Sequence, residues 1–227
     1  MKKSPASLNL VDTNSAFLIT EWARNQIGPA GQEKPPTFSY GDLLPILADF
    51  RRGAGMRPVD VSLAFVSLDP ANRSQQKFPD ALERFGYVVE RLDFRHNFIS
   101  PPNPSEVEKH EPKGVASLGP NIAYTLGLMA GQAGGSTVKP DVVLVSGGFE
   151  VYNPLLHLVR RTGGKAAVCF FRRFLDPRWI TNGILDPDSP IQFWDLDPHS
   201  ERVLGVSLGK LLKAATVPGR GGLDSIF

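Results

Sequence analysis

The sequence predicts an α/β fold: a doubly wound, mostly parallel sheet of five to six strands with helices on both faces. Apolar runs of strand length alternate with segments of helical periodicity along the chain. These runs are apolar almost throughout, which is typical of parallel strands that are buried on both faces. The chain has 227 residues, of which 41% are hydrophobic and 21% charged, and this is ample for one α/β domain with a substantial core.

Each strand is predicted from a short apolar run that ends at a turn signal. The run that contains DVVLVSG is the most apolar, and the final run is expected to form an edge strand. The predicted strands cover residues 7–12, 59–68, 87–94, 141–147, 165–171 and 191–196.

The predicted helices follow from apolar residues at helical spacing, with glycine or proline at the ends. Trp22 and Ile27 belong to the first apolar face, and Gly163 closes a later helix. Pro45 either bends the second helix or marks a late start. The predicted helices cover residues 16–28, 40–52, 78–86, 116–135, 153–164 and 207–215.

The domain organisation predicted from these elements is simple. We expect an N-terminal tail over residues 1–6, a single domain over 7–215 and a flexible C-terminal tail over 216–227. Residues 96–114 carry four prolines and predict a long polar loop, a type that is often functional but is sometimes merely mobile. Residues 172–190 predict irregular structure.

Composition narrows the classes of function. With 25 Lys and Arg against 23 Asp and Glu, the net charge is +2, which argues against bulk electrostatic binding of nucleic acid but leaves room for a local basic patch. Cys169 is the only cysteine, lies in an apolar run and is expected to be buried. We find neither a signal peptide nor an apolar run of membrane-spanning length, so we expect a cytoplasmic protein without membrane contact.

Polar residues follow the predicted strands at their carboxyl ends, where doubly wound sheets bind their ligands. Asp12 has two interpretations that the sequence leaves open: a helix N-cap or a metal ligand. Asn14 is interpreted as a cap or an orienting partner. The residues predicted at this edge are Asp12, Asn14, Asp69, Asp93, Ser146, Gly147, Gly148, Glu150, Arg172 and Arg173.

Four segments together resemble the NYN domain family, the LabA-like branch of the PIN-like nucleases. They are VDTNS, KGVAS, DVVLVSGGFEVYNPLL and GKAAVCFF, and they occur in the family's order across roughly residues 7–197. The resemblance implies a ribonuclease-like fold in which clustered carboxylates bind Mg²⁺ or Mn²⁺ and activate water against a phosphodiester. Hard divalent cations prefer such oxygen ligands, and they generate the nucleophile and neutralise phosphate charge.

Matched position by position, the family's acidic site is reduced in this chain. Asp12 matches the first acid and Glu150 the last, whereas Ala116 and Gly148 stand where the family has two further acids. The resemblance therefore implies that Asp12 and Glu150 form the catalytic and metal-binding pair. Loss of two anionic ligands should weaken metal affinity, although Mg²⁺ often uses only one or two protein carboxylates.

Four other residues could modify this reduced site. Asn14 and Ser146 match supporting positions of the family, and Ser146 either orients a ligand or turns the chain. Asp69 and Asp93 either supply compensating carboxylates or are turn or surface residues.

The turn of Gly147 and Gly148 is expected to bind an anion or a phosphate oxygen. Glycine supplies neither charge nor ligand, but it lets backbone amides approach an anion near a helix N-terminus.

Basic residues predict a rim around this small acidic centre that suits an RNA backbone. The alternative is that they are solvated ends of strands. If the rim binds RNA, Phe98, Phe174 and Trp179 would stack on unpaired bases. In the alternative interpretation, these aromatic residues belong to the core. The rim residues are Arg95, Lys113, Arg172, Arg173 and Arg178.

Three functions follow from these observations. The first is an RNA-binding NYN-like or PIN-like domain with weak or no nuclease activity, and the second is an active Mg²⁺- or Mn²⁺-dependent ribonuclease. The third is a non-catalytic module that binds a nucleotide, a protein partner or a second copy of the chain. The missing acids at Ala116 and Gly148 favour a binding role over hydrolysis.

Overall fold

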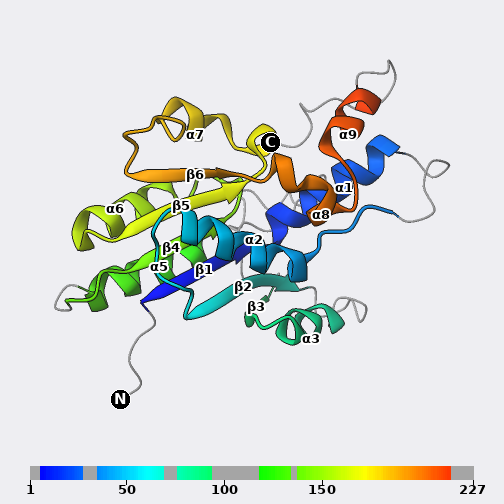
Figure 1. Ribbon diagram of the computed structural model, residues 1–227. Helices are drawn as coiled ribbons and strands as arrows, with labels where there is room; N and C mark the ends of the chain where they lie inside the picture. The colour runs from blue at the N-terminus through cyan, green and yellow to red at the C-terminus, as the bar shows by residue number, and fades with distance from the viewer. Residues whose placement is uncertain (1–5, 28–34, 69–75, 94–117, 134–136, 216–227) are drawn as a thin grey trace, which may run out of the picture.

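Six parallel strands form one sheet in a computed structural model that describes residues 6–27, 35–68, 76–93, 118–133 and 137–215 (Figure 1). The strand order is β3-β2-β1-β4-β5-β6, and every pair of neighbouring strands is parallel. The predicted doubly wound α/β fold is therefore confirmed. The strands are β1 (Ser7–Asp12), β2 (Val61–Leu68), β3 (Val88–Asp93), β4 (Asp141–Val145), β5 (Lys165–Phe170) and β6 (Ile191–Asp195).

Helices connect successive strands, as the alternating sequence pattern predicts. None of the described helices is both long and apolar enough to cross a lipid bilayer. The described helices are α1 (Thr13–Ile27), α2 (Tyr40–Gly53), α3 (Lys77–Arg84), α5 (Gly119–Ala133), α6 (Tyr152–Thr162), α7 (Pro177–Thr181), α8 (Ser200–Leu204) and α9 (Leu208–Ala215), with short 3₁₀ helices η2 (Arg172–Phe174) and η3 (Asp197–His199).

The first half of the chain forms β1, β2 and β3, and the second half forms β4, β5 and β6. The two halves of the sheet therefore meet where β1 pairs with β4. Right-handed crossovers then put the connections of the two halves on opposite faces of the sheet. α2 crosses the near face in Figure 1, and α5 packs against α6. α1 leaves the carboxyl end of β1, extends beyond the sheet and packs against α9. The point where the strand order reverses therefore lies between β1 and β4, at the foot of α1.

Local sequence signals explain where several helices begin and end. Ser39 caps α2, because its side-chain oxygen accepts a hydrogen bond from the Asp42 amide at 3.3 Å. Gly163 ends α6 with a φ of 64°, a left-handed conformation that glycine adopts without strain. Pro45 lies inside α2, which already begins at Tyr40, so it does not mark a late start.

One part of the segment predicted to be irregular is helical. It contains η2 and α7, and the start of α7 has a conventional sequence basis. Asp176 is its N-cap and accepts a hydrogen bond from the Arg178 amide at 2.9 Å, and Pro177 occupies the first turn. α7 has only five residues, which is too few for a helical spacing of apolar residues to be recognised in the sequence.

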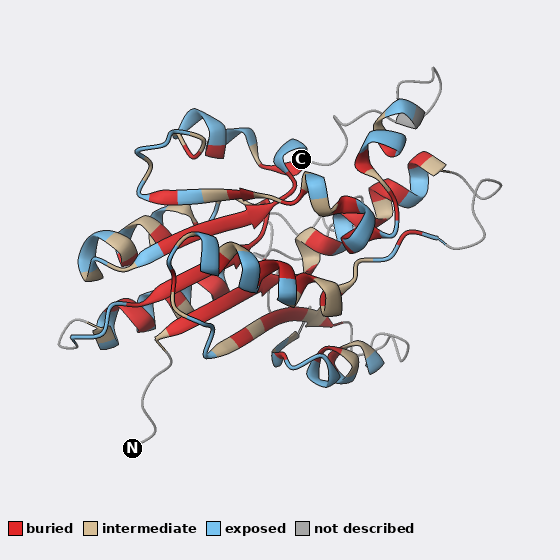
Figure 2. Cartoon of the chain, in the orientation of Figure 1, coloured by how far each residue is buried: buried red, intermediate tan, exposed pale blue. Residues whose placement is uncertain are grey.

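The core lies along the central strands, which are buried on both faces (Figure 2). Every residue of β1 and β4 is buried. Cys169 on β5 is fully buried, as expected, and burial raises the pKa of its thiol well above the ordinary value.

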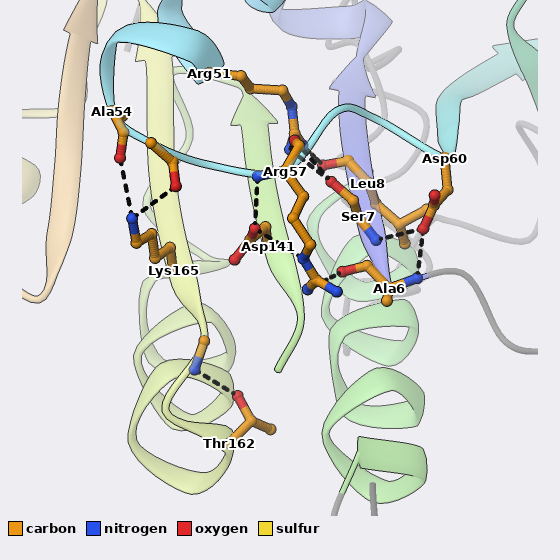
Figure 3. Close-up of polar contacts among 12 residues, drawn as sticks. Ala6, Ser7, Leu8, Arg51, Ala54, Arg57, Asp60, Asp141, Thr162 and Lys165 are labelled. Carbon is orange, nitrogen blue, oxygen red and sulfur yellow. Dashed lines mark hydrogen bonds and ion pairs between the residues drawn. The ribbon is translucent and has the colours of Figure 1, made fainter. Parts of the chain in front are cut away.

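A buried arginine satisfies the polar groups at the amino edge of the sheet (Figure 3). Arg51 is 2% exposed, and its guanidinium donates to Ser7 Oγ at 2.7 Å and to the Leu8 carbonyl. It also donates to Asn9 Oδ1 at 2.9 Å, so the one amide side chain of β1 is satisfied. Burial lowers the pKa of Arg51 to about 10, which still leaves it charged near neutrality. This edge is occupied by structural contacts, and the opposite edge carries the candidate site.

Candidate functional site at the carboxyl edge

Asp12 is the last residue of β1, and its carboxylate is surrounded by hydrogen-bond donors. Oδ1 accepts from the amides of Asn14 at 3.0 Å and Ser15 at 3.2 Å, which is the geometry of a helix N-cap. Oδ2 accepts from Ser15 Oγ at 2.7 Å and Ser146 Oγ at 2.9 Å. A carboxylate has about four lone-pair positions, so all of them are used within the protein.

Burial changes the acidity of Asp12. The residue is 8% exposed, and desolvation raises the pKa of its carboxyl group above the ordinary value. The hydrogen bonds from Ser15, Ser146 and the two amides act in the opposite direction without cancelling the effect of burial. The amide hydrogen bonds to Oδ1 show that Asp12 is an N-cap, one of the two interpretations that the sequence left open. Asn14 contributes its backbone amide to that cap.

Ser15 and Ser146 join the ends of two neighbouring strands. β1 pairs with β4, so the turn after β4 lies beside the first turn of α1. The two hydroxyl oxygens are 3.2 Å apart, and both bond to Asp12 Oδ2. Ser146 was predicted at this site. Ser15 was missed, although its spacing of three residues after Asp12 is the signal of a cap contact.

The Gly147–Gly148 turn is closed by contacts within the protein. The Gly147 amide donates to Ser15 Oγ at 3.3 Å and the Gly148 amide to Ser146 Oγ at 3.1 Å. The two amides that we expected to bind a phosphate are therefore already engaged, and the anion-binding interpretation of this turn loses its basis.

Close packing explains the first glycine of this turn. A Cβ atom on Gly147 would lie 2.5 Å from the Phe174 carbonyl oxygen and 2.6 Å from the Phe170 ring. The Gly147 carbonyl also accepts from the Asp176 amide at 3.0 Å. The glycine is needed for close approach to the segment after β5, rather than for contact with a ligand.

Glu150 lies over Gly148, with its side chain exposed. A Cβ atom on Gly148 would be 2.5 Å from Glu150 Oε2 and 3.6 Å from Ser146 Oγ. The carboxylate of Glu150 thus occupies the space where the acid missing at Gly148 would begin. Its negative charge also contributes to raising the pKa of Arg178. Glu150 lies in the turn between β4 and α6, whereas Asp12 ends the neighbouring strand β1.

Tyr40 is a further residue near Asp12 that the sequence did not reveal. It begins α2 and packs edge-on against Phe78 and Tyr87, with ring centroids 5.5 and 6.2 Å apart. Burial raises the pKa of Tyr40, and the negative charge of Asp12 raises it further, so the hydroxyl stays protonated. Tyr40 and Asp12 are 28 residues apart in sequence, and no motif connects them.

The three arginines after β5 are exposed beside the Gly147–Gly148 turn. Arg172 and Arg173 form η2 directly after the carboxyl end of β5. Arg178 pairs with Asp176 at 2.6 Å, and this contact raises the pKa of Arg178 and lowers that of Asp176. Its guanidinium carbon also lies 5.0 Å from the centroid of the Phe149 ring. Arg172 and Arg173 are thus the exposed cations of this group that have no described ion pair.

Two predicted base-stacking residues belong to the core. Phe174 is 2% exposed and packs edge-on against Trp22, with ring centroids 4.8 Å apart. Trp179 is fully buried, packs against Phe149 and donates from Nε1 to the Gly148 carbonyl at 3.1 Å. The stacking interpretation is wrong for both, because the Phe174 ring packs against α1 and the Trp179 ring holds α7 against the turn after β4.

Several predicted residues lie outside what the structure describes. Four of them lie between β3 and α5, and the acid Asp69 directly follows β2. Asp93 ends β3, but its side chain is not described. The residues outside the described ranges are Asp69, Arg95, Phe98, Lys113 and Ala116.

The described residues do not suit the Mg²⁺ or Mn²⁺ that the family resemblance implies. No group of three or more His, Cys, Asp or Glu side chains capable of holding a metal occurs within the described ranges. Asp12 would have to give up hydrogen bonds from Ser15 or Ser146 to bind a cation. The hydroxyl groups of these serines would then lose their acceptor in a buried place, which costs free energy. A metal-dependent step through Asp12 therefore does not follow from this geometry.

Comparison with known proteins identifies the fold without identifying a function. No protein-family description matches the chain, and no curated protein does so. One solved structure is similar: the crystal structure of VPA0982, a protein of unknown function from Vibrio parahaemolyticus. It shares 14% sequence identity with a TM-score of 0.55, over 90% of this chain and 99% of that one. At this identity the likeness supports the fold alone.

Proposed function

We propose that this protein is an RNA-binding domain on a NYN-like or PIN-like scaffold, with weak or no nuclease activity. The observation that carries the proposal is the saturation of the Asp12 carboxylate by four donors from Asn14, Ser15 and Ser146. In a metal-dependent nuclease this carboxylate would have lone pairs directed at the ion. Here it caps α1 and fastens the turn after β4.

The binding role is supported by the exposed arginines at the same edge. Arg172 and Arg173 follow β5, whose carboxyl end packs on the Gly147 turn. Doubly wound sheets bind ligands at this edge, next to the point where the strand order reverses. Arginines that contact phosphates give binding that is sequence-tolerant and salt-dependent.

The test measures the affinity of the protein for a fluorescent single-stranded RNA across a series of salt concentrations. Replacement of Arg172, Arg173 and Arg178 by alanine should weaken binding and lower the log–log salt slope by about 2, since each phosphate contact on a single strand contributes about 0.7. Unchanged affinity and slope would contradict the proposal.

A matched control removes three charges from the opposite edge of the sheet. Arg52 lies at the end of α2, and Arg160 and Arg161 at the end of α6, before the amino ends of the following strands. Their replacement by alanine changes the net charge equally and should leave the slope nearly unchanged. An equal loss in both triple variants would indicate general electrostatics rather than a site at the carboxyl edge.

A further inference from the structure

Two acidic side chains meet where β6 ends beside the proposed RNA-binding arginines. Asp195 is the last residue of β6, and its Oδ1 accepts from the Asp197 amide at 2.8 Å. Asp197 begins η3, and its Oδ1 accepts from the Arg172 amide at 3.2 Å. The negative charge of Asp195 also acts on the Asp197 carboxyl group, so the two carboxyl groups are close enough to interact. A hydrogen bond between two carboxyl groups requires one of them to hold a proton.

The acidic pair is fixed to the arginine corner by the backbone. The Leu196 amide donates to the Phe170 carbonyl at 3.0 Å, which continues the pairing of β5 and β6 beyond the end of β6. Together with the Arg172–Asp197 bond, this contact holds the start of η2 against the start of η3. A change in the charge of the pair is therefore a change in the surroundings of Arg172 and Arg173.

We propose that Asp195 and Asp197 form a proton-responsive latch on this corner, which binds an RNA backbone more tightly when the pair holds a proton. Uptake of a solvent proton removes one negative charge beside Arg172 and Arg173 and allows the two carboxyl groups to share a hydrogen bond. Release restores the charge and the repulsion. The RNA part of this inference rests on the proposed function, whereas the latch itself does not.

The acidity of Asp197 agrees with this geometry. Desolvation raises the pKa of Asp197 to about 6, the charge of Asp195 adds to the effect, and the Arg172 amide and the charge of Arg173 oppose it. The pair would then change its charge just below neutral pH. Coupled carboxyl groups share a proton in the same way in other proteins.

The other titratable groups around the corner have separate roles in the described structure. Cys169 on β5 feels the charge of Asp195, but its thiol stays neutral because burial raises its pKa. His199 ends η3 and packs edge-on against Phe50 at 5.4 Å between ring centroids. On the adjoining α8, Glu201 is exposed and Arg202 pairs with Asp42 at 3.2 Å.

The experiment compares RNA affinity between pH 5 and pH 8 at constant ionic strength for the wild type and Asp197→Asn. We expect wild-type affinity to rise roughly threefold to tenfold as the pH falls through about 6, the size of effect expected for one charge acting across several ångströms near a protein surface. Asp197→Asn should bind at pH 7.5 as tightly as the wild type at pH 5 and should lack this step.

The control variant is Asp188→Asn, which removes an exposed charge from the turn before β6 and should keep the step. A step that persists unchanged in Asp197→Asn would overturn the latch and assign the pH dependence to other groups, such as histidines.

A second readout separates failure of the latch from failure of the proposed function. The NMR chemical shift of the Arg172 amide reports on its bond to Asp197 without any RNA. A midpoint near pH 6 in the wild type that is absent from Asp197→Asn would support the latch even if no RNA binds at any pH, in which case the proposed function alone fails. A midpoint near 4, the ordinary value for aspartate, would overturn the latch.

Discussion

The Ser146 hydroxyl donates a 2.9 Å hydrogen bond to Asp12 Oδ2, and this bond joins the ends of the two central strands. Ser146 belongs to the turn after β4, whereas Asp12 ends β1 and caps α1. The bond therefore fixes three elements at the edge where a ligand would bind. It also uses the lone pair that a metal would need, so the same contact explains the architecture of the edge and the proposed loss of metal chemistry.

Asp12→Ala should destabilise the protein far more than Asp12→Asn. Alanine removes the cap, which is worth about 1 kcal/mol, and leaves buried donors of Ser15 and Ser146 without an acceptor, for a total of about 2–4 kcal/mol. Asparagine keeps the oxygen that accepts from the two amides, and the hydroxyls can rotate to accept from its Nδ2. Its cost should be below about 1 kcal/mol in urea denaturation. Equal losses would show that charge, rather than hydrogen bonding, is what this position requires.

Gly147→Ala should be strongly destabilising. Its Cβ would lie 2.5 Å from the backbone oxygen of Phe174, so the chain after β5 would have to move, at a cost of about 1–3 kcal/mol. Gly127→Ala is the matched control, because a Cβ there meets nothing within 4 Å and alanine favours the helix by up to about 1 kcal/mol. Thermal unfolding of both variants checks this. A neutral Gly147→Ala would mean that the turn is not packed as described.

Arg51→Met should cost at least about 3 kcal/mol, since it leaves buried acceptors on Ser7, Leu8 and Asn9 without a donor. The neighbouring Arg52→Met removes the same charge from a side chain that is 79% exposed, and its effect should stay within about 0.5 kcal/mol. Urea denaturation of the two variants gives the comparison. Similar values for both would contradict the role assigned to Arg51 at the amino edge.

The free energy of unfolding should rise when the pH is lowered from 7 to about 5. The pKa of Asp197 is about 6 in the folded protein and near 3.9 when unfolded, so the folded state binds more protons in this window and is stabilised by acidification. The raised pKa of Asp12 acts in the same direction. For Asp197 we expect on the order of 1 kcal/mol after screening by solvent.

Urea denaturation at several pH values measures this effect. Asp197→Asn should remove most of the rise between pH 7 and pH 5. Asp42 and Asp176 affect stability in the opposite direction, because their pKa values are lowered in the folded protein. The stability that they contribute at neutral pH is lost as the pH falls through those lowered pKa values. A wild-type stability that decreases from pH 7 to pH 5 would contradict the assignment.

The sequence predicted the fold because its strongest signals are local. The apolar runs of β1, β4 and β5 are almost entirely buried, and most strands end at or directly before a polar residue. The same reasoning brought Asp12 and Ser146 together at one edge, since carboxyl ends of neighbouring parallel strands must meet there.

Other features depend on contacts between distant segments, and local patterns do not contain them. Trp179 follows a cluster of arginines, which suggested base stacking, but its ring is buried against Phe149 from another connection. Tyr40 comes close to Asp12 only because α2 begins at the edge where β1 ends. The sequence pattern did not single out Asp195 and Asp197, because their burial and the bond to Arg172 arise only in the folded chain.

Restoring the missing acids provides a separate check on the reduced site. In the double variant Ala116→Asp and Gly148→Asp, the new side chain at position 148 would displace the Glu150 carboxylate, which lies 2.5 Å from its Cβ position. We expect Mn²⁺-dependent cleavage of RNA to stay at the wild-type level in this variant, because the Asp12 carboxylate keeps its four hydrogen-bond donors. Cleavage that appears only in this variant would show that the two missing acids, rather than the saturation of Asp12, account for the reduced activity.

The most direct test of the central claim is cleavage of single-stranded RNA by the wild-type protein in Mn²⁺, measured beside Asp12→Asn. If Asp12 is a structural cap with no lone pair left for a metal, both proteins should show the same low level of cleavage, and both should bind RNA equally with or without Mn²⁺. Robust Mn²⁺-dependent cleavage by the wild type that Asp12→Asn abolishes would contradict this account and identify an active metal-dependent ribonuclease.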